Sequence, residues 1–304
     1  MRAFPRLGTR IGLAVLALGL AVSAPAFADK DADASYKEGL AYKAENKPDQ
    51  AIKAMEAAVA ANPKHGMAWA SLGAMYKQQK DLAKAIDAYE HATALITKDA
   101  VLWTNLGTAY ANTNKLDQAL AALQTACKLN PKDADIRAYL GTVQRKKNDY
   151  TNAVINLEIA TKLKPDNADW QHNLGVAYRF AKRDDDAVKA FNAAIALHSN
   201  DPTYPLDLAV VYRRKQEVDK AIPEYEKATA LDPANADGWF DLGFMYKENH
   251  DNDKAVGAFK HYLELKKGKD ADGEKRVTDE CASLGGDCGG AKKGTPTKTP
   301  PKKK

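Results

Sequence analysis

The sequence predicts an all-α protein made of seven repeats of 34 residues, and three observations support this fold class. A glycine, replaced once by alanine, recurs every 34 residues: Gly39, Gly73, Gly107, Gly141, Gly175, Ala209 and Gly243. An alanine recurs with the same period: Ala51, Ala85, Ala119, Ala153, Ala187, Ala221 and Ala255. No insertion or deletion disturbs either series. Because a fixed period of this size indicates stacked repeats, we expect a solenoid of helix pairs over residues 32–269.

The third repeat, residues 100–133, shows the unit clearly. Its first half has large or small apolar residues at i, i+3, i+4 and i+7, one face of a helix: Trp103, Leu106, Gly107 and Tyr110. After a polar turn at residues 112–115, a second helical face follows: Ala119, Leu123 and Ala126. Pro131 ends this helix, since the residue before a proline is disfavoured in the helical region. Gly107 and Ala119 have almost no side chain, so we expect the two backbones to approach closely there.

This pattern resembles the tetratricopeptide repeat family. The second repeat matches the family pattern at Trp69, Leu72, Gly73, Tyr76, Ala85, Tyr89 and Ala92, and the seventh at Trp239, Leu242, Gly243, Tyr246, Ala255 and Phe259. The resemblance covers seven repeats, at residues 32–65, 66–99, 100–133, 134–167, 168–201, 202–235 and 236–269. It implies a right-handed superhelix of helix-turn-helix units, with a concave groove that is lined by the first helices and binds other proteins.

Two repeats depart from the pattern inside the array. Repeat four has Gln144 where the aromatic residue stands, so we expect looser packing there. Repeat six has Pro205 in the first turn of its first helix and Pro223 about one turn into its second helix. An interior proline costs about 3 kcal/mol and one hydrogen bond, so a kink is expected in repeat six.

The N-terminal segment, residues 1–28, is interpreted as a cleavable signal peptide. Arg2, Arg6 and Arg10 precede an apolar run over residues 11–22, and small residues follow at 26–28. The run is shorter than the roughly 20 residues that span a bilayer. The mature chain is therefore expected to begin near Asp29 and to reside in the periplasm, with the extracellular space as the alternative.

Beyond the repeats, residues 270–290 are expected to form a capping helix and a disulfide loop. Val277, Cys281 and Leu284 have helical spacing, and Gly285 follows as a helix stop. Cys281 and Cys288 are close in sequence in a chain predicted to enter an oxidising compartment, which favours a disulfide. Residues 291–304 are rich in lysine and proline and are expected to be disordered.

We find no catalytic motif in the sequence, and the protein is predicted not to be an enzyme. There is no glycine-rich phosphate loop, nucleophile elbow or paired-histidine motif, so no cofactor and no metal are expected. The acidic runs at residues 184–186 and 251–253 fall at turns, where short polar side chains commonly cap helices. Cys127 is expected to be a small packed residue.

The formal charge of +5 becomes +2 without the three signal-peptide arginines, and −4 once the six lysines of residues 291–304 are set aside. On this acidic body, the twelfth residue of most repeats is basic, and we call these residues the basic stripe: Lys43, Lys77, Arg145, Arg179, Arg213 and Lys247. Asn105 and Asn173 stand at the sixth position, where the family resemblance implies contact with the backbone of an extended peptide. The alternative is a solvated face, because the helix dipole favours cations near a C-terminus by about 0.3 to 1 kcal/mol each.

The sequence thus predicts a scaffold of the bacterial cell envelope that binds an extended acidic segment of a partner protein through the basic stripe. Outer-membrane assembly, pilus and motility complexes are candidate systems. A structural protein that holds an anionic envelope polymer through its basic tail is the alternative. Nucleic acid is not an expected partner outside the cytoplasm, and the processed chain is not expected to span a membrane.

Overall fold

The computed structural model describes residues 25–288, and confirms the all-α fold class within that range, which contains fifteen helices and no strand. Their bounds are α1 Pro25–Ala44, α2 Pro48–Ala61, α3 Gly66–Gln78, α4 Leu82–Leu95, α5 Ala100–Asn112, α6 Leu116–Leu129, α7 Ala134–Lys146, α8 Tyr150–Leu163, α9 Ala168–Phe180, α10 Asp184–Leu197, α11 Thr203–Arg214, α12 Val218–Leu231, α13 Ala236–Glu248, α14 Asn252–Lys266 and α15 Ala271–Ser283. The predicted signal peptide lies mostly, and the predicted tail wholly, outside the described residues.

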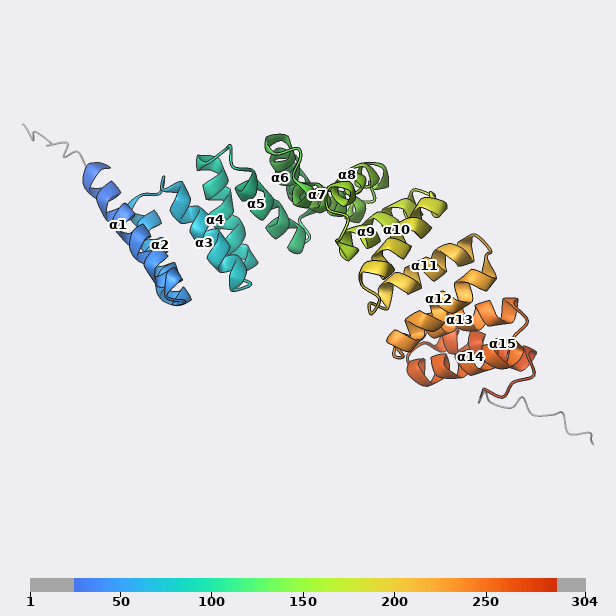
Figure 1. Cartoon of the computed structure of the whole chain (residues 1–304). Helices are drawn as coiled ribbons and strands as arrows, with labels where there is room; N and C mark the ends of the chain where they lie inside the picture. Colours follow the sequence, from blue (N-terminus) through green and yellow to red (C-terminus); the bar gives the residue numbers. More distant parts are fainter. Residues whose placement is uncertain (1–24, 289–304) are drawn as a thin grey trace, which may run out of the picture. The chain divides into compact units, whose positions relative to one another are not determined.

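Each repeat forms a pair of helices that pack on each other, as α5 and α6 do in Figure 1. The repeated glycine explains why they can approach. A Cβ atom on Gly107 would lie 2.6 Å from Cγ of Leu123 and 3.3 Å from the carbonyl oxygen of Ala119. A side chain there would therefore collide with the second helix, which confirms the close approach expected from the sequence.

The turn within each repeat has one residue in the left-handed region, always at the fifteenth position: Asn46, Lys80, Asn114, Asn148, Lys182, Gln216 and His250. The next residue donates its N–H to the carbonyl of the eleventh residue, as Arg183 does to Tyr178 at 2.9 Å. This bond satisfies a carbonyl at the end of the first helix. The turn geometry therefore recurs in all seven repeats although only three of the seven residues are asparagine.

The chain divides into two compact units, residues 1–96 and 97–304. In the first unit, the described helices are α1 to α4, with Met55, Leu72 and Tyr89 almost fully buried. The second unit contains α5 to α15, and its core includes Leu157, Phe191, Tyr225 and Phe259.

Repeat four is not loosely packed around Gln144, contrary to the expectation from its sequence. Gln144 is buried and accepts a hydrogen bond from the side-chain amide of Asn156 at 2.8 Å. The side-chain oxygen of Asn156 in turn accepts from the Arg137 guanidinium at 2.8 Å. The polar side chain is tolerated because its buried oxygen is satisfied.

The second helix of repeat six, α12, continues through Pro223 as one helix from Val218 to Leu231. In the first helix, α11, Pro205 is the third residue and is buried. A proline in the first turn removes an N–H that has no partner within the helix. The structure thus absorbs both prolines without ending either helix.

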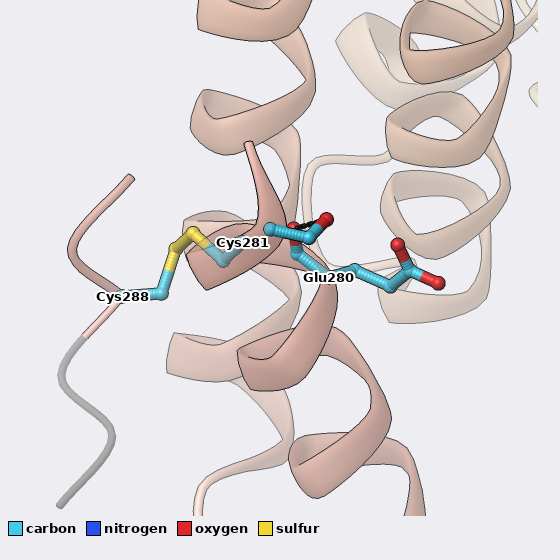
Figure 2. The surroundings of a disulfide bond; sticks show 4 residues. Glu280, Cys281 and Cys288 are labelled. Atoms are coloured by element: carbon cyan, nitrogen blue, oxygen red, sulfur yellow. Dashed lines mark hydrogen bonds between the residues drawn. A yellow bond between two sulfur atoms is a disulfide. The ribbon is translucent and has the colours of Figure 1, made fainter. Parts of the chain in front are cut away.

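The second unit ends in α15, which packs on α14. Val277 and Cys281 are its buried residues. Gly285 has a φ of +77°, and Gly286 donates its N–H to the carbonyl of Cys281 at 2.9 Å, a glycine-type helix stop. Figure 2 shows the disulfide that joins Cys281 to Cys288, with a Cα–Cα distance of 6.1 Å. Such a distance lies within the usual range for disulfides.

The capping role expected of the acidic runs is wrong. The N-cap of α10 is Arg183, which makes no side-chain cap, and Asp251 precedes α14 without a side-chain cap bond. Instead, the acidic side chains lie in the first turn of α10, where the helix dipole favours negative charge. Cys127 is buried as a free thiol on α6. None of the helices described between residues 25 and 288 is long and apolar enough to cross a bilayer.

Candidate functional site

The residues of the basic stripe are divided between the two units. Lys43 on α1 and Lys77 on α3 belong to the first unit, where Lys43 is exposed and burial lowers the pKa of Lys77. The other four lie on the first helices of repeats four to seven in the second unit: Arg145, Arg179, Arg213 and Lys247. Among these helices, α7 contacts α9, and α9 contacts α11, so Arg145, Arg179 and Arg213 occupy one register on successive neighbours.

Arg179 on α9 is neutralised by a carboxylate of the next repeat. Its guanidinium lies 3.1 Å from Oδ1 of Asp207 on α11, and both side chains are only about a fifth exposed, at 18% and 19%. The other oxygen of Asp207 lies 2.7 Å from Nε2 of His172, also on α9. A single carboxylate therefore serves two side chains of α9.

Arg213 and Lys247 are neutralised in the same way. Arg213 on α11 pairs with Asp241 on α13, which also accepts a hydrogen bond from the Tyr225 hydroxyl at 3.1 Å. Lys247 on α13 pairs with Glu280 on the capping helix α15. Three of the four cations in this unit thus have an acidic partner on the following first helix or cap.

Arg145 on α7 differs, because no ion pair to it is found among the described residues. Asn173 stands 28 residues later, where Asp207 follows Arg179 and Asp241 follows Arg213. The Nε atom of Arg145 is covered and has no hydrogen-bond partner within the described part of the chain. Burial lowers the pKa of Arg145, whereas attraction from Asp207 raises it. The cation is therefore partly desolvated, with only a shared carboxylate nearby.

A second set of ion pairs joins consecutive repeats at their turns. Arg214 donates from Nε to Asp184 at 3.0 Å, and Lys215 donates to Asp185 at 2.6 Å. Lys147 pairs with Asp117 at the equivalent place two repeats earlier. This is the role of the acidic run at residues 184–186 that the sequence analysis missed; the 30-residue spacing to basic residues was the available signal.

An exposed aromatic pair flanks the arginines of α7 and α9. Phe180, the last residue of α9, is 49% exposed, and the Arg179 guanidinium lies 4.9 Å from the centre of its ring. Tyr150, the first residue of α8, stacks on Phe180 at 4.8 Å with an interplanar angle of 10°. These two residues were also missed from the sequence, because each stands just past the turn rather than on the predicted stripe.

Near the cap, a cavity of about 450 Å³ is lined by four aspartates with aromatic and basic neighbours: Asp237, Asp241, Asp270, Asp272, Phe240, Tyr262, Gly273 and Arg276. Arg276 of α15 lies over the Phe244 ring at 4.6 Å, so the cap itself covers this aromatic surface. Among residues 25–288, no group of three or more His, Cys, Asp or Glu side chains is arranged to hold a metal.

The two predicted asparagines lie on first helices of the second unit, Asn105 on α5 and Asn173 on α9, and both are half-buried. Of the whole predicted site, the structure brings Arg145, Asn173 and Arg179 onto two neighbouring helices, α7 and α9. The acidic partners Asp207, Asp241 and Glu280 were not predicted to neutralise the stripe. The 28-residue spacing of the first two could have revealed them.

Comparisons with known proteins agree with this architecture. A family model described as the cilia and flagella-associated protein 70 C-terminal domain, a tetratricopeptide repeat model, matches residues 13–203. A second model, described as TPR repeat, matches residues 209–249. No curated protein sequence matches significantly.

Several solved structures are similar. The crystal structure of MamA is 26% identical, with 54% of this chain and 96% of that chain covered and a TM-score of 0.52. YrrB, described as a TPR protein with an unusual peptide-binding site, is 21% identical over 66% of this chain and 100% of its own, with a TM-score of 0.56. A tetratricopeptide repeat protein from Parabacteroides merdae is 16% identical over 84% and 99%, with a TM-score of 0.56. The last two show the fold alone.

Proposed function

Because the chain belongs to the tetratricopeptide repeat family, whose members serve as protein-interaction scaffolds, we propose that it is a non-enzymatic scaffold of the bacterial cell envelope. It binds an extended acidic segment of a partner protein through the first helices of repeats four to six, α7, α9 and α11. The predicted signal peptide supports the periplasmic location, and the described peptide-binding site of YrrB supports a peptide as the ligand.

One observation carries the choice of an acidic partner. On α7 and α9, the two cations Arg145 and Arg179 share the field of a single carboxylate, Asp207, which also contacts His172. This part of the surface therefore keeps an excess of positive charge, although the body of the chain is acidic. Charge complementarity of this kind favours an anionic partner and speeds its association.

Site-specific photocrosslinking in intact cells tests the proposal. Tyr139 on α7 is 43% exposed and stands at the same repeat position as Asn173 and Asp207, so a photoreactive phenylalanine derivative fits there. Ile155 on the second helix α8 is 50% exposed and provides the matched control. We expect mass spectrometry to identify a protein captured from position 139 and not from position 155. Equal capture from both positions, or none from position 139, would contradict the proposed surface.

Salt and truncation sharpen the result. Binding of the captured partner should weaken as salt rises, because the Debye length falls from about 10 Å at 0.1 M to about 3 Å at 1 M. Removal of residues 292–304, which lie outside the described residues, should leave capture unchanged. Loss of capture on that truncation would favour an anionic ligand of the lysine-rich tail.

The location has its own test. Intact mass measurement of the periplasmic fraction should find a chain that begins near Asp29. A full-length chain recovered from the cytoplasmic fraction would contradict export.

A further inference from the structure

The step from α7 to α9 differs from the next step along the second unit in one residue. Arg179 and Arg213 each meet an aspartate 28 residues later, whereas Arg145 is followed at this spacing by Asn173. An asparagine side chain donates and accepts hydrogen bonds but carries no charge. The position that neutralises the other arginines is therefore polar and uncharged next to Arg145.

The consequence is a cation with reason to bind an external carboxylate. Arg145 is half-buried, and burial of an unpaired charge is costly unless a partner restores the lost hydration. A guanidinium offers a planar fork of donors that fits both oxygens of a carboxylate. Asp207 attracts Arg145 but is in contact with Arg179 and His172.

The same Asp207 limits the charge of an incoming ligand. A doubly charged group such as a phosphate would be repelled by this carboxylate more strongly than a singly charged carboxylate would be. The mixture of two arginines, one aspartate and one asparagine therefore suits a single negative charge.

The chemistry beside that charge is apolar. Phe180 is 49% exposed and stacks on Tyr150, and Tyr150 is close enough to Arg145 to influence its pKa electrostatically. Arg179 lies over the outer part of the same aromatic pair at 4.9 Å from the Phe180 ring. An apolar side chain next to the carboxylate would thus find an aromatic surface at the edge of the arginines.

We propose that Arg145, with Asn173 and Arg179, is the anchor for one carboxylate of the partner segment, and that Tyr150 and Phe180 receive an apolar residue next to it. The anchor rests on the proposed function and names the partner's chemistry: an acidic residue adjacent to an apolar one. The remaining basic residues of the second unit hold the repeats together instead of contacting the ligand.

Arrays of random nine-residue peptides test this anchor with the purified full chain. One array has blocked ends and the other has free C-termini, which separates side-chain carboxylates from terminal ones. We expect the bound peptides of at least one array to share an acidic group next to an apolar residue. Replacement of that acid by its amide should remove binding.

Variants of the protein locate the contact. Asn173→Asp supplies Arg145 with the carboxylate that Arg179 and Arg213 already have, so peptide affinity should fall about tenfold or more, as for loss of a hydrogen bond to a charged group. Arg145→Gln should cause a similar loss, and Phe180→Ser should relax the preference for the apolar residue. Asn192→Asp is the matched control, since it adds the same charge on an exposed site of α10.

Circular dichroism and melting temperature verify that each variant is folded, and Asn173→Asp should melt no lower than the wild type. If acidic peptides bind the wild type and Asn173→Asp and Arg145→Gln equally well, the anchor is wrong while the proposed scaffold function stands. If selection shows no acidic preference at all, both are overturned.

Discussion

Arg145 and Arg179 occupy the same position in neighbouring repeats, yet their surroundings assign them different roles. Arg179 is locked to Asp207 at 3.1 Å, and Arg213 and Lys247 are paired in the same way with Asp241 and Glu280. Arg145 faces a repeat in which the aspartate has become Asn173. The comparison teaches that a repeated cation is part of the framework where the next repeat supplies an acid, and is available to a ligand where it does not.

This difference changes what charge reversal is expected to do. From the sequence, reversal of Arg145, Arg179 and Arg213 together would weaken partner binding about tenfold or more with little effect on melting temperature, since each exposed pair contributes only about 0.2 to 1 kcal/mol. The ion pairs to Asp207 and Asp241 make that expectation of unchanged stability untenable for two of the three residues.

The largest expected effect is a loss of stability in a double variant, Arg179→Glu with Arg213→Glu. Each change removes a charge-assisted hydrogen bond, worth about 1.5 to 3 kcal/mol, and places a second carboxylate beside Asp207 or Asp241. Arg145→Glu should cost little stability, because that arginine has no ion pair to lose within the described residues. Urea unfolding followed by circular dichroism measures the three variants and the wild type.

Equal losses for Arg145→Glu and Arg179→Glu, each tested singly, would break the comparison. High salt is the control, since it should narrow the gap between them by screening the new repulsion.

The second effect concerns the cap, where Lys247 depends on Glu280 next to Cys281 (Figure 2). In the chain-entropy model, the closed loop of eight residues from Cys281 to Cys288 is worth roughly 2.5 kcal/mol. A Cys288→Ser variant should therefore exchange the amide hydrogens of α15 faster, while those of α7 and α9 change little.

Thiol labelling supplies the chemical control. Labelling of the denatured but unreduced periplasmic protein should find Cys127 alone. Labelling of Cys281 and Cys288 as well would show that the exported protein lacks the disulfide.

The smallest expected effect separates backbone strain from charge in the same region. Lys182 follows α9 with a φ of +60°, which an L-residue with a side chain adopts at a cost. Lys182→Gly should raise the free energy of unfolding by about 0.5 to 1 kcal/mol. Lys182→Ala removes the same charge and keeps the strain, so it should not stabilise. A gain in both variants would indicate that the lysine charge, not the turn, was responsible.

The sequence by itself determined the fold class and the register. Glycines and alanines at intervals of 34 residues leave room for only one close approach of two helices, and the collision of a Cβ on Gly107 with Leu123 shows why the spacing is strict. It also placed the cap helix within one residue at each end, because helical spacing and Gly285 are local signals.

Only the tertiary structure decided which cations are neutralised. The partner of Arg179 lies on another helix, and a charge count along the chain cannot distinguish a cation that faces a carboxylate from one that faces an amide. Gln144 illustrates the same limit, since its burial is tolerated through a hydrogen bond from Asn156 on the neighbouring helix. Local periodicity fixes where side chains point, but pair energies depend on distances between repeats, which are set when the helices pack.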